Sequence, residues 1–277
     1  MSRSDGDGAR VGDSVMPDRI STGTPGLDRL LGGGLLPGAV YSVIGPPGSG
    51  KSILGIQFLI EGVKRGESSL LVSIDEPPCE IRENMLRMFG ENFDRILVLD
   101  GTLEIKHYEI TPLRDVSIVR HAEAFGNVFP EIPNSMDLRN PEMTVGSLQE
   151  MIKAEVRDKN VTRLVIDSLT GIKLFMMPVA ERNRFLQSFM RFLCDLGITT
   201  LAIIQEGDNA NPEASMIEHL MSRGVIRLHR WLQSNGFRLG ISVEKFRGSE
   251  HDETVTRSKI TPIGYQVMGH TKLRGGD

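Results

Sequence analysis

Gly45, Gly50, Lys51 and Ser52 have the spacing of a phosphate-binding loop, G-x-x-x-x-G-K-[ST]. Glycines let backbone N–H groups approach phosphate oxygens without a Cβ atom in the way. A lysine adds a positive charge for the β- and γ-phosphates, and the serine hydroxyl can bind Mg²⁺. The pattern predicts a nucleoside triphosphate site with Mg²⁺. The residues expected to hold the nucleotide are Pro47, Gly48, Ser49, Gly50, Lys51, Ser52 and Ile53.

Two acidic residues follow the second expected strand, at 69–74. Asp75 and Glu76 precede two prolines, which end the strand, so their carboxylates lie at its C-terminal end. Ligands of open parallel sheets bind at that edge. Glu76 is therefore a candidate general base for the attacking water, with Asp75 as its neighbour or orienting group. The alternative is a solvated acidic loop or an N-cap pair for the next helix.

Two further strand ends carry polar groups. Residues 163–168 contain several apolar residues followed by Asp167, which is typical of a Walker B strand. This acid would hold Mg²⁺ together with Ser52. The strand at 199–204 ends at Gln205, whose amide could sense the γ-phosphate or position water. The alternative is an ordinary polar strand terminus.

Lys245 and Arg247 are two cations at positions i and i+2 of an expected strand, so they point the same way. Such a pair suits stabilisation of phosphate charge, in its own subunit or in a neighbour's site. The alternative is a solvated basic edge strand. The pair follows an Asn-Gly turn between apolar runs at 225–232 and 237–246, which predicts a β-hairpin.

The elements that must position these residues alternate between strand and helix. We expect an α/β fold with a mostly parallel sheet, flanking helices and a C-terminal β-hairpin. The expected strands are 40–44, 69–74, 95–99, 163–168 and 199–204. The expected helices are a single turn within 21–38, followed by 53–65, about 81–88, 144–159 and 178–196.

The domain boundaries follow from composition. We expect a disordered tail at 1–17, one domain at 18–268 and a loose tail at 269–277. Proline-rich residues 101–144 form an irregular insertion, which is either a lid or partner surface or a mobile segment. The N-terminal tail could instead be an arm that binds a partner.

Charge and cysteine content narrow the classes of partner and compartment. A net charge of −4 gives no general attraction for nucleic acid or acidic membranes. The two cysteines, Cys79 and Cys194, argue for a reducing compartment. No apolar run approaches membrane-spanning length, so we expect no membrane insertion and a cytoplasmic protein.

Together these motifs resemble the KaiC-like group of RecA-type ATPases over roughly residues 20–268. The resemblance rests on the phosphate-binding loop, Asp75-Glu76-Pro77, Asp167, and Lys245-Phe246-Arg247-Gly248-Ser249, with Gly26-Leu27-Asp28 and a glycine triplet upstream. It implies a RecA-like sheet in a homo-oligomeric ring, usually a hexamer, with ATP and Mg²⁺ at the subunit interfaces. It further implies that Glu76 is the catalytic glutamate and that Lys245 and Arg247 reach the neighbour's γ-phosphate.

The chain also departs from the family pattern. It has room for one such domain where KaiC has two, and His219-Leu220 occupy the position where autophosphorylating domains carry Ser and Thr, which argues against autokinase activity. The leading hypothesis is an ATP-hydrolysing ring that couples nucleotide state to an unidentified protein partner in a regulatory or scaffolding role. The alternatives are a DNA-acting ATPase and a scaffold that binds nucleotide without hydrolysis. The DNA-acting alternative is disfavoured because acidic residues after the strand at 199–204 would repel DNA phosphates. These residues are Glu206, Asp208, Glu213 and Glu218.

Overall fold

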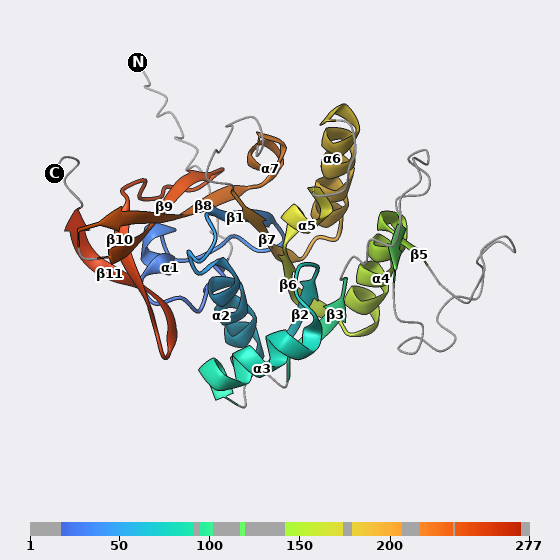
Figure 1. Cartoon of the computed structure of the whole chain (residues 1–277), viewed down its shortest axis with the longest axis horizontal. Helices are drawn as coiled ribbons and strands as arrows, with labels where there is room; N and C mark the ends of the chain where they lie inside the picture. Colours follow the sequence, from blue (N-terminus) through green and yellow to red (C-terminus); the bar gives the residue numbers. More distant parts are fainter. Residues whose placement is uncertain are drawn as a thin grey trace, which may run out of the picture.

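A computed structural model describes residues 18–90, 95–101, 117–119, 142–173, 179–206, 216–234 and 236–272. In this part of the chain, nine strands form one sheet in the order β11-β10-β9-β8-β1-β7-β6-β2-β3 (Figure 1). The expected tail at 1–17 and most of the insertion at 101–144 lie outside the described residues. Within the insertion, β4 (Ser117–Val119) and β5 (Glu142–Thr144) form a short antiparallel pair.

The parallel part of the sheet carries the predicted strand ends. Its strands are β1 (Val40–Gly45), β7 (Thr199–Gln205), β6 (Val161–Asp167), β2 (Ser68–Ser73) and β3 (Leu97–Asp100), all paired in parallel. Parallel strands put their carboxyl ends at the same edge of the sheet. The mostly parallel sheet expected from the sequence is therefore confirmed.

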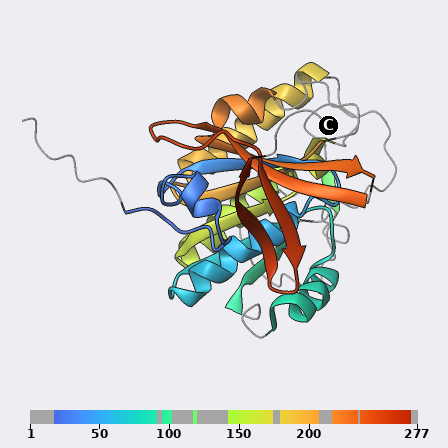
Figure 2. The same cartoon turned by 90° about the vertical axis from the view of Figure 1, so that its left-hand side faces the viewer.

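The C-terminal part of the sheet consists of two hairpins. The expected one is β8 (Gly224–Gln233) with β9 (Gly236–Phe246), and β8 also runs parallel to β1. The second, β10 (Thr256–Thr261) with β11 (Gly264–Lys272), was not predicted (Figure 2). Strand β11 continues to Lys272, so regular structure extends past the expected boundary at 268.

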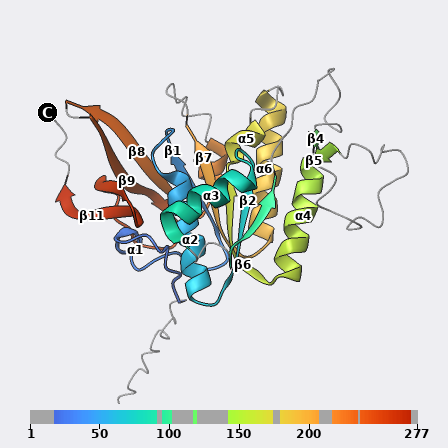
Figure 3. The same ribbon diagram turned by 60° about the horizontal axis from the view of Figure 1, so that its bottom comes forward.

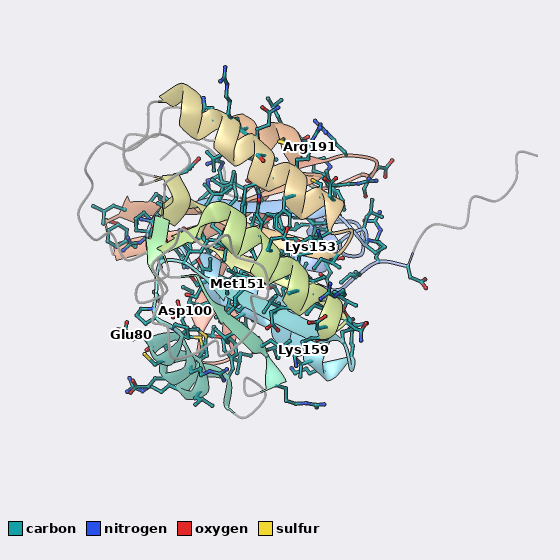
Figure 4. The ribbon with its side chains drawn as sticks, turned by 90° about the vertical axis from the view of Figure 1, so that its right-hand side faces the viewer. Glu80, Asp100, Met151, Lys153, Lys159 and Arg191 are labelled. Carbon is teal, nitrogen blue, oxygen red and sulfur yellow. The ribbon has the colours of Figure 1, made fainter. Side chains whose placement is uncertain are left out.

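Helices cover both faces of the sheet (Figures 3 and 4). On one face, α2 (Lys51–Lys64) and α3 (Pro78–Phe89) contribute to one hydrophobic cluster; on the other, α4 (Val145–Asp158) and α6 (Val179–Asp195) contribute to a second. The single helical turn expected within 21–38 is α1 (Leu27–Leu30). Two other short helices, α5 (Leu169–Lys173) and α7 (Met216–Met221), were not predicted.

A buried arginine joins the strand that ends in Asp167 to the helix that begins at Lys51. Arg163, in β6, is fully buried and makes a bidentate ion pair with Glu67, at 2.7 and 2.9 Å. It also donates to the carbonyls of Ser21 and Phe58, and its guanidinium lies over the Phe58 ring of α2 at 4.7 Å from the centroid. The hydrogen bonds that Glu67 accepts from Arg163 lower the pKa of the Glu67 carboxyl below its ordinary value. The contacts fix β6 against α2.

Two further observations concern the helices and the cysteines. Among the described residues, every helix is too short or too polar to cross a membrane. Cys79 and Cys194 lie on α3 and α6, and both are exposed free thiols.

Candidate functional site

The loop between β1 and α2 forms an anion cradle at the carboxyl edge of the sheet. Gly48 and Gly50 have φ angles of +69° and +96°, which side chains disfavour. A Cβ atom at Gly50 would lie 2.8 Å from the Tyr265 ring of β11. The Ser49 hydroxyl is buried and has no hydrogen-bond partner among the described residues. A backbone of this shape presents N–H groups to a phosphate at the start of α2.

A cavity of about 330 Å³ opens beside this loop. It brings together the ends of β1, β2, β6 and β7, and it is bounded by the β10–β11 hairpin. Its lining residues are Pro47, Gly48, Gly50, Lys51, Ser52, Ile53, Ser73, Asp75, Glu76, Ile81, Asp167, Ser168, Ile203, Gln205 and Ile260. Of the residues expected to hold the nucleotide, all but the buried Ser49 line this cavity.

Lys51 folds back over the loop. Its ammonium group donates to the Pro46 carbonyl at 2.9 Å, and the side chain is largely buried. Burial lowers its pKa, and the nearby carboxylates of Asp167, Asp75 and Glu206 act in the opposite direction. A phosphate oxygen is a stronger acceptor for an ammonium group than a neutral carbonyl.

Ser52 and Asp167 meet at the floor of the cavity, where the Ser52 hydroxyl hydrogen-bonds the Asp167 carboxyl. Burial raises the pKa of Asp167 to about 6; the bond from Ser52 opposes this, and the carboxylates of Asp75 and Glu76 add to it. Hard oxygen donors beside a phosphate cradle suit Mg²⁺, which takes one or two protein oxygens and completes its shell with phosphate and water. These two residues therefore fit the expected magnesium site.

Asp75 and Glu76 have different surroundings. Asp75 accepts a hydrogen bond from the Ser168 hydroxyl at 2.5 Å and another from the Ser168 backbone N–H, so it joins the end of β2 to the residue after Asp167. Asp75 is exposed overall, as Glu76 is, but partial burial of its carboxyl group raises its pKa, against these bonds. Glu76 is an exposed residue that lines the cavity, and its carbonyl accepts from Ser73 Oγ at 2.5 Å.

Neither acid caps the following helix. The N-cap of α3 is Pro77, and no side chain hydrogen-bonds to it there. The predicted alternative of an N-cap pair is therefore wrong, because the chain turns into α3 through proline and leaves the Glu76 carboxylate at the cavity.

Gln205, at the end of β7, also lines the cavity. Its backbone N–H donates to the Thr170 hydroxyl of α5 at 2.7 Å, which fixes the strand end while the residue stays exposed. Glu206 follows it and starts a network of ion pairs. Arg227 pairs with Glu206 at 2.5 Å and with Glu244, which also contacts His219 at 3.2 Å.

This network lowers the pKa of the Glu244 carboxyl. Burial would raise its pKa, but the hydrogen bonds from His219 and Arg227 outweigh burial and hold it at about 2.

Lys245 and Arg247 lie away from the cavity of their own subunit. Lys245 pairs with Val225 near the start of β8, and its ammonium group donates to the carbonyls of His219 and Ser222 at the end of α7. The Arg247 N–H donates to Arg223, whose N–H donates to Val40, the first residue of β1. Arg247 is thus level with Val40, the first residue of β1. Gly45 is at the other end of this strand, and six strand residues span about 17–20 Å. Action on the nucleotide of the same subunit is thus incompatible with the fold, because the pair lies at the opposite edge.

Sequence reasoning missed the residues that close the cavity from the C-terminal side. Ile260 and Tyr265 contact the loop at Gly50, and Gln57 of α2 exchanges two hydrogen bonds with the Tyr265 backbone, at 2.7 and 3.2 Å. Ser168 was also missed as the partner of Asp75. An apolar residue in a short polar strand gives no local signal that it packs on a loop about 200 residues earlier.

Comparison with known proteins agrees with this geometry. The family model described as "ATPase: KaiC" matches residues 20–272. A UPF0273 protein of Aeropyrum pernix is 29% identical over 267 residues, covering 94% of this chain and 98% of that protein. The circadian clock protein KaiC3 of Synechocystis is 27% identical over 237 residues, covering 85% of this chain and 42% of KaiC3.

The crystal structure of a KaiC-like protein from Pyrococcus horikoshii has the same fold. It superposes with a TM-score of 0.69 at 22% identity, covering 91% of this chain and 100% of that one. The match of the family model spans nearly all of the described residues, including every motif of the cavity. This chain therefore belongs to the KaiC ATPase family.

Proposed function

We propose that this protein is a Mg²⁺-dependent ATPase. The observation that carries the proposal is the convergence, on one cavity, of a glycine cradle, a buried lysine, a serine–aspartate pair and an exposed glutamate. Membership of the family supports ATP binding through the phosphate loop. The position of Glu76 beside that loop supports the proposal of hydrolysis.

Each residue would have a distinct role. The N–H groups of the loop bind phosphate oxygens, and the Lys51 ammonium exchanges the Pro46 carbonyl for a phosphate. Ser52 and Asp167 would hold Mg²⁺, which offsets phosphate charge when bound. Glu76 would accept a proton from the attacking water. Asp75, tied to Ser168, keeps the β2 end in register with the β6 end and so orients its neighbour.

We further propose that the protein acts as a homo-oligomeric ring, with six subunits as in the expectation from the family. Lys245 and Arg247 lie at the edge opposite the cavity, so they can contribute to the site of an adjacent subunit. A head-to-tail contact of this kind closes into a ring when the rotation permits. The ring would couple its nucleotide state to a protein partner in the cytoplasm, where unpaired cysteines such as Cys79 and Cys194 persist.

The proposal is tested with Glu76→Gln, using Glu80→Gln as the matched control. Glu80 lies on the first turn of α3 (Figure 4) and is not among the described residues that line the cavity. We expect Glu76→Gln to bind ATP normally and to lose about 10²- to 10⁴-fold in hydrolysis rate, as removal of a general base does. Glu80→Gln should hydrolyse at the wild-type rate. Unchanged hydrolysis in Glu76→Gln would remove Glu76 from its role, and a wild-type protein that binds without turnover would establish the scaffold alternative.

The DNA-acting alternative needs a separate test. Glu206 is already paired with Arg227, and Asp208 and Glu213 lie outside the described residues. A gel shift with single-stranded DNA at increasing salt measures binding directly. We expect no shift at physiological salt. A tight complex under these conditions would favour the DNA-acting alternative over the proposed role.

A further inference from the structure

An arginine outside every predicted motif lies against the apex of the phosphate loop. Strand β8 continues past the end of β1, since Ile44 pairs with Arg227 and β8 extends to Gln233. Arg230, on this extension, donates through Nη1 to the Pro47 carbonyl at 3.3 Å. A Cβ atom built on Gly48 would lie 3.5 Å from the same nitrogen. Arg230 is therefore a neighbour of two cavity-lining residues.

The guanidinium is held by its face. Its central carbon lies 3.8 Å from the centroid of the Phe237 ring on β9, although Phe237 itself is 57% exposed. Stacking on an aromatic ring leaves the N–H donors open, because they lie in the plane of the guanidinium. Among the described residues, the one side-chain hydrogen bond from Arg230 is that to the Pro47 carbonyl. The group is fixed in place while its N–H edge is largely unused.

The cavity is lined by more carboxylates than cations, so a further cation beside it would favour the binding of a phosphate chain. Of the described residues that line the cavity, Lys51 is the one cation, against the carboxylates of Asp75, Glu76 and Asp167. A triphosphate adds several negative charges, of which one Mg²⁺ offsets two. A second fixed cation at the rim would bind the phosphate chain more strongly than a neutral side chain there.

We propose that Arg230 binds the phosphate chain of the nucleotide in its own subunit. Side-chain rotation exchanges the Pro47 carbonyl for a phosphate oxygen, and Phe237 is the platform that keeps the guanidinium at the rim. This residue is distinct from Lys245 and Arg247, which lie at the other edge of the sheet. The inference rests on the proposed function in that it requires a nucleotide in the cavity.

The test compares ATP, ADP and adenosine binding by titration calorimetry in the presence of Mg²⁺. Arg230→Gln should weaken ATP binding by about tenfold, since a charge-assisted hydrogen bond is lost. Adenosine, which has no phosphate, should bind with unchanged affinity. Arg230→Lys should restore part of the loss, and Phe237→Leu should show a smaller loss because it keeps the bulk and removes the aromatic face.

The control is Arg238→Gln on the same hairpin. Arg238 is adjacent to Leu239, the cross-strand partner of Arg230, so its side chain leaves the opposite face of the sheet. It bonds to Gln233 at 3.1 Å and not to the loop. We expect wild-type affinity for all three ligands in this variant.

The results separate this inference from the proposed function. If wild type binds ATP and Arg230→Gln binds it within twofold, the inference alone fails. An equal loss for ATP and adenosine would also overturn it, because Arg230 would then only brace the loop. A wild-type protein that does not bind ATP would refute the proposed function itself.

Discussion

Removal of the buried guanidinium of Arg163 should destabilise the whole domain. In Arg163→Met the apolar volume is retained, but Glu67, whose side chain is 28% exposed, loses two charged hydrogen bonds, and the carbonyl of Ser21 loses its donor. Breaking a buried ion pair by removing one partner costs about 3–5 kcal/mol. In a domain of this size, this corresponds to a fall in Tm of roughly 10 °C.

The assay is urea denaturation of Arg163→Met, Glu67→Gln and the double variant, followed by circular dichroism. The double variant should be less destabilised than the sum of the single variants by about 1–3 kcal/mol, because the Met no longer faces an unpaired carboxylate. The pKa of Glu67 is lowered from 4.5 in the folded state, so its contribution is present above pH 4.5 and disappears as the pH falls through the folded pKa. A loss below about 1 kcal/mol in Arg163→Met, or strict additivity, would refute the reasoning.

Three further predictions concern other parts of the molecule. Gly50→Ala should destabilise the fold by about 1–3 kcal/mol and abolish ATP binding, because its Cβ atom meets a ring of β11. Gly66 also has a positive φ, +78° against +96° at Gly50, but a Cβ atom there meets nothing within 4 Å. In urea denaturation Gly66→Ala should therefore cost less, and it should leave ATP titrations unchanged. Glu244→Gln should be less stable than wild type at pH 6, and this difference should shrink between pH 4.5 and about 2 in urea titrations, since the folded carboxyl has a pKa of about 2; a constant difference would contradict the network. Mixing inactive Arg247→Ala with inactive Glu76→Gln should restore ATPase activity at about a quarter of the interfaces in an equal mixture, and no recovery would argue against action between subunits.

Much of the fold was predictable because its signals are local. The phosphate loop lies between a β-branched run and a helical pattern, and Asp75 and Asp167 each end an apolar strand. Parallel pairing then brings those ends to one edge without any further information. The parallel sheet, the flanking helices and the β8–β9 hairpin were accordingly correct.

The remaining features depend on contacts between distant residues. The short polar strand β10 gives Ile260 no mark that it packs on the loop at Gly50. Arg163 reads as a surface cation between two strand residues, and only the assembled core shows that it is buried. Lys245 lies in a strand, as predicted, but its side chain turns to the carbonyl groups at the end of α7. Cations are favoured at helix C-termini, and the spacing of residues in the sequence does not reveal that this helix end is near.

The distance between the cavity and the basic edge has a consequence for how the protein would respond to its own abundance. Under the proposal that Glu76 activates water and that Lys245 and Arg247 act on a neighbouring subunit, a solitary chain would have the acid but not the cations of a complete site, because its own pair lies at the opposite edge of the sheet. Under the proposed assignment, turnover per molecule rises with total protein until all contacts are occupied and falls again on dilution. The amount of protein in the cell would then regulate the reaction without any added effector.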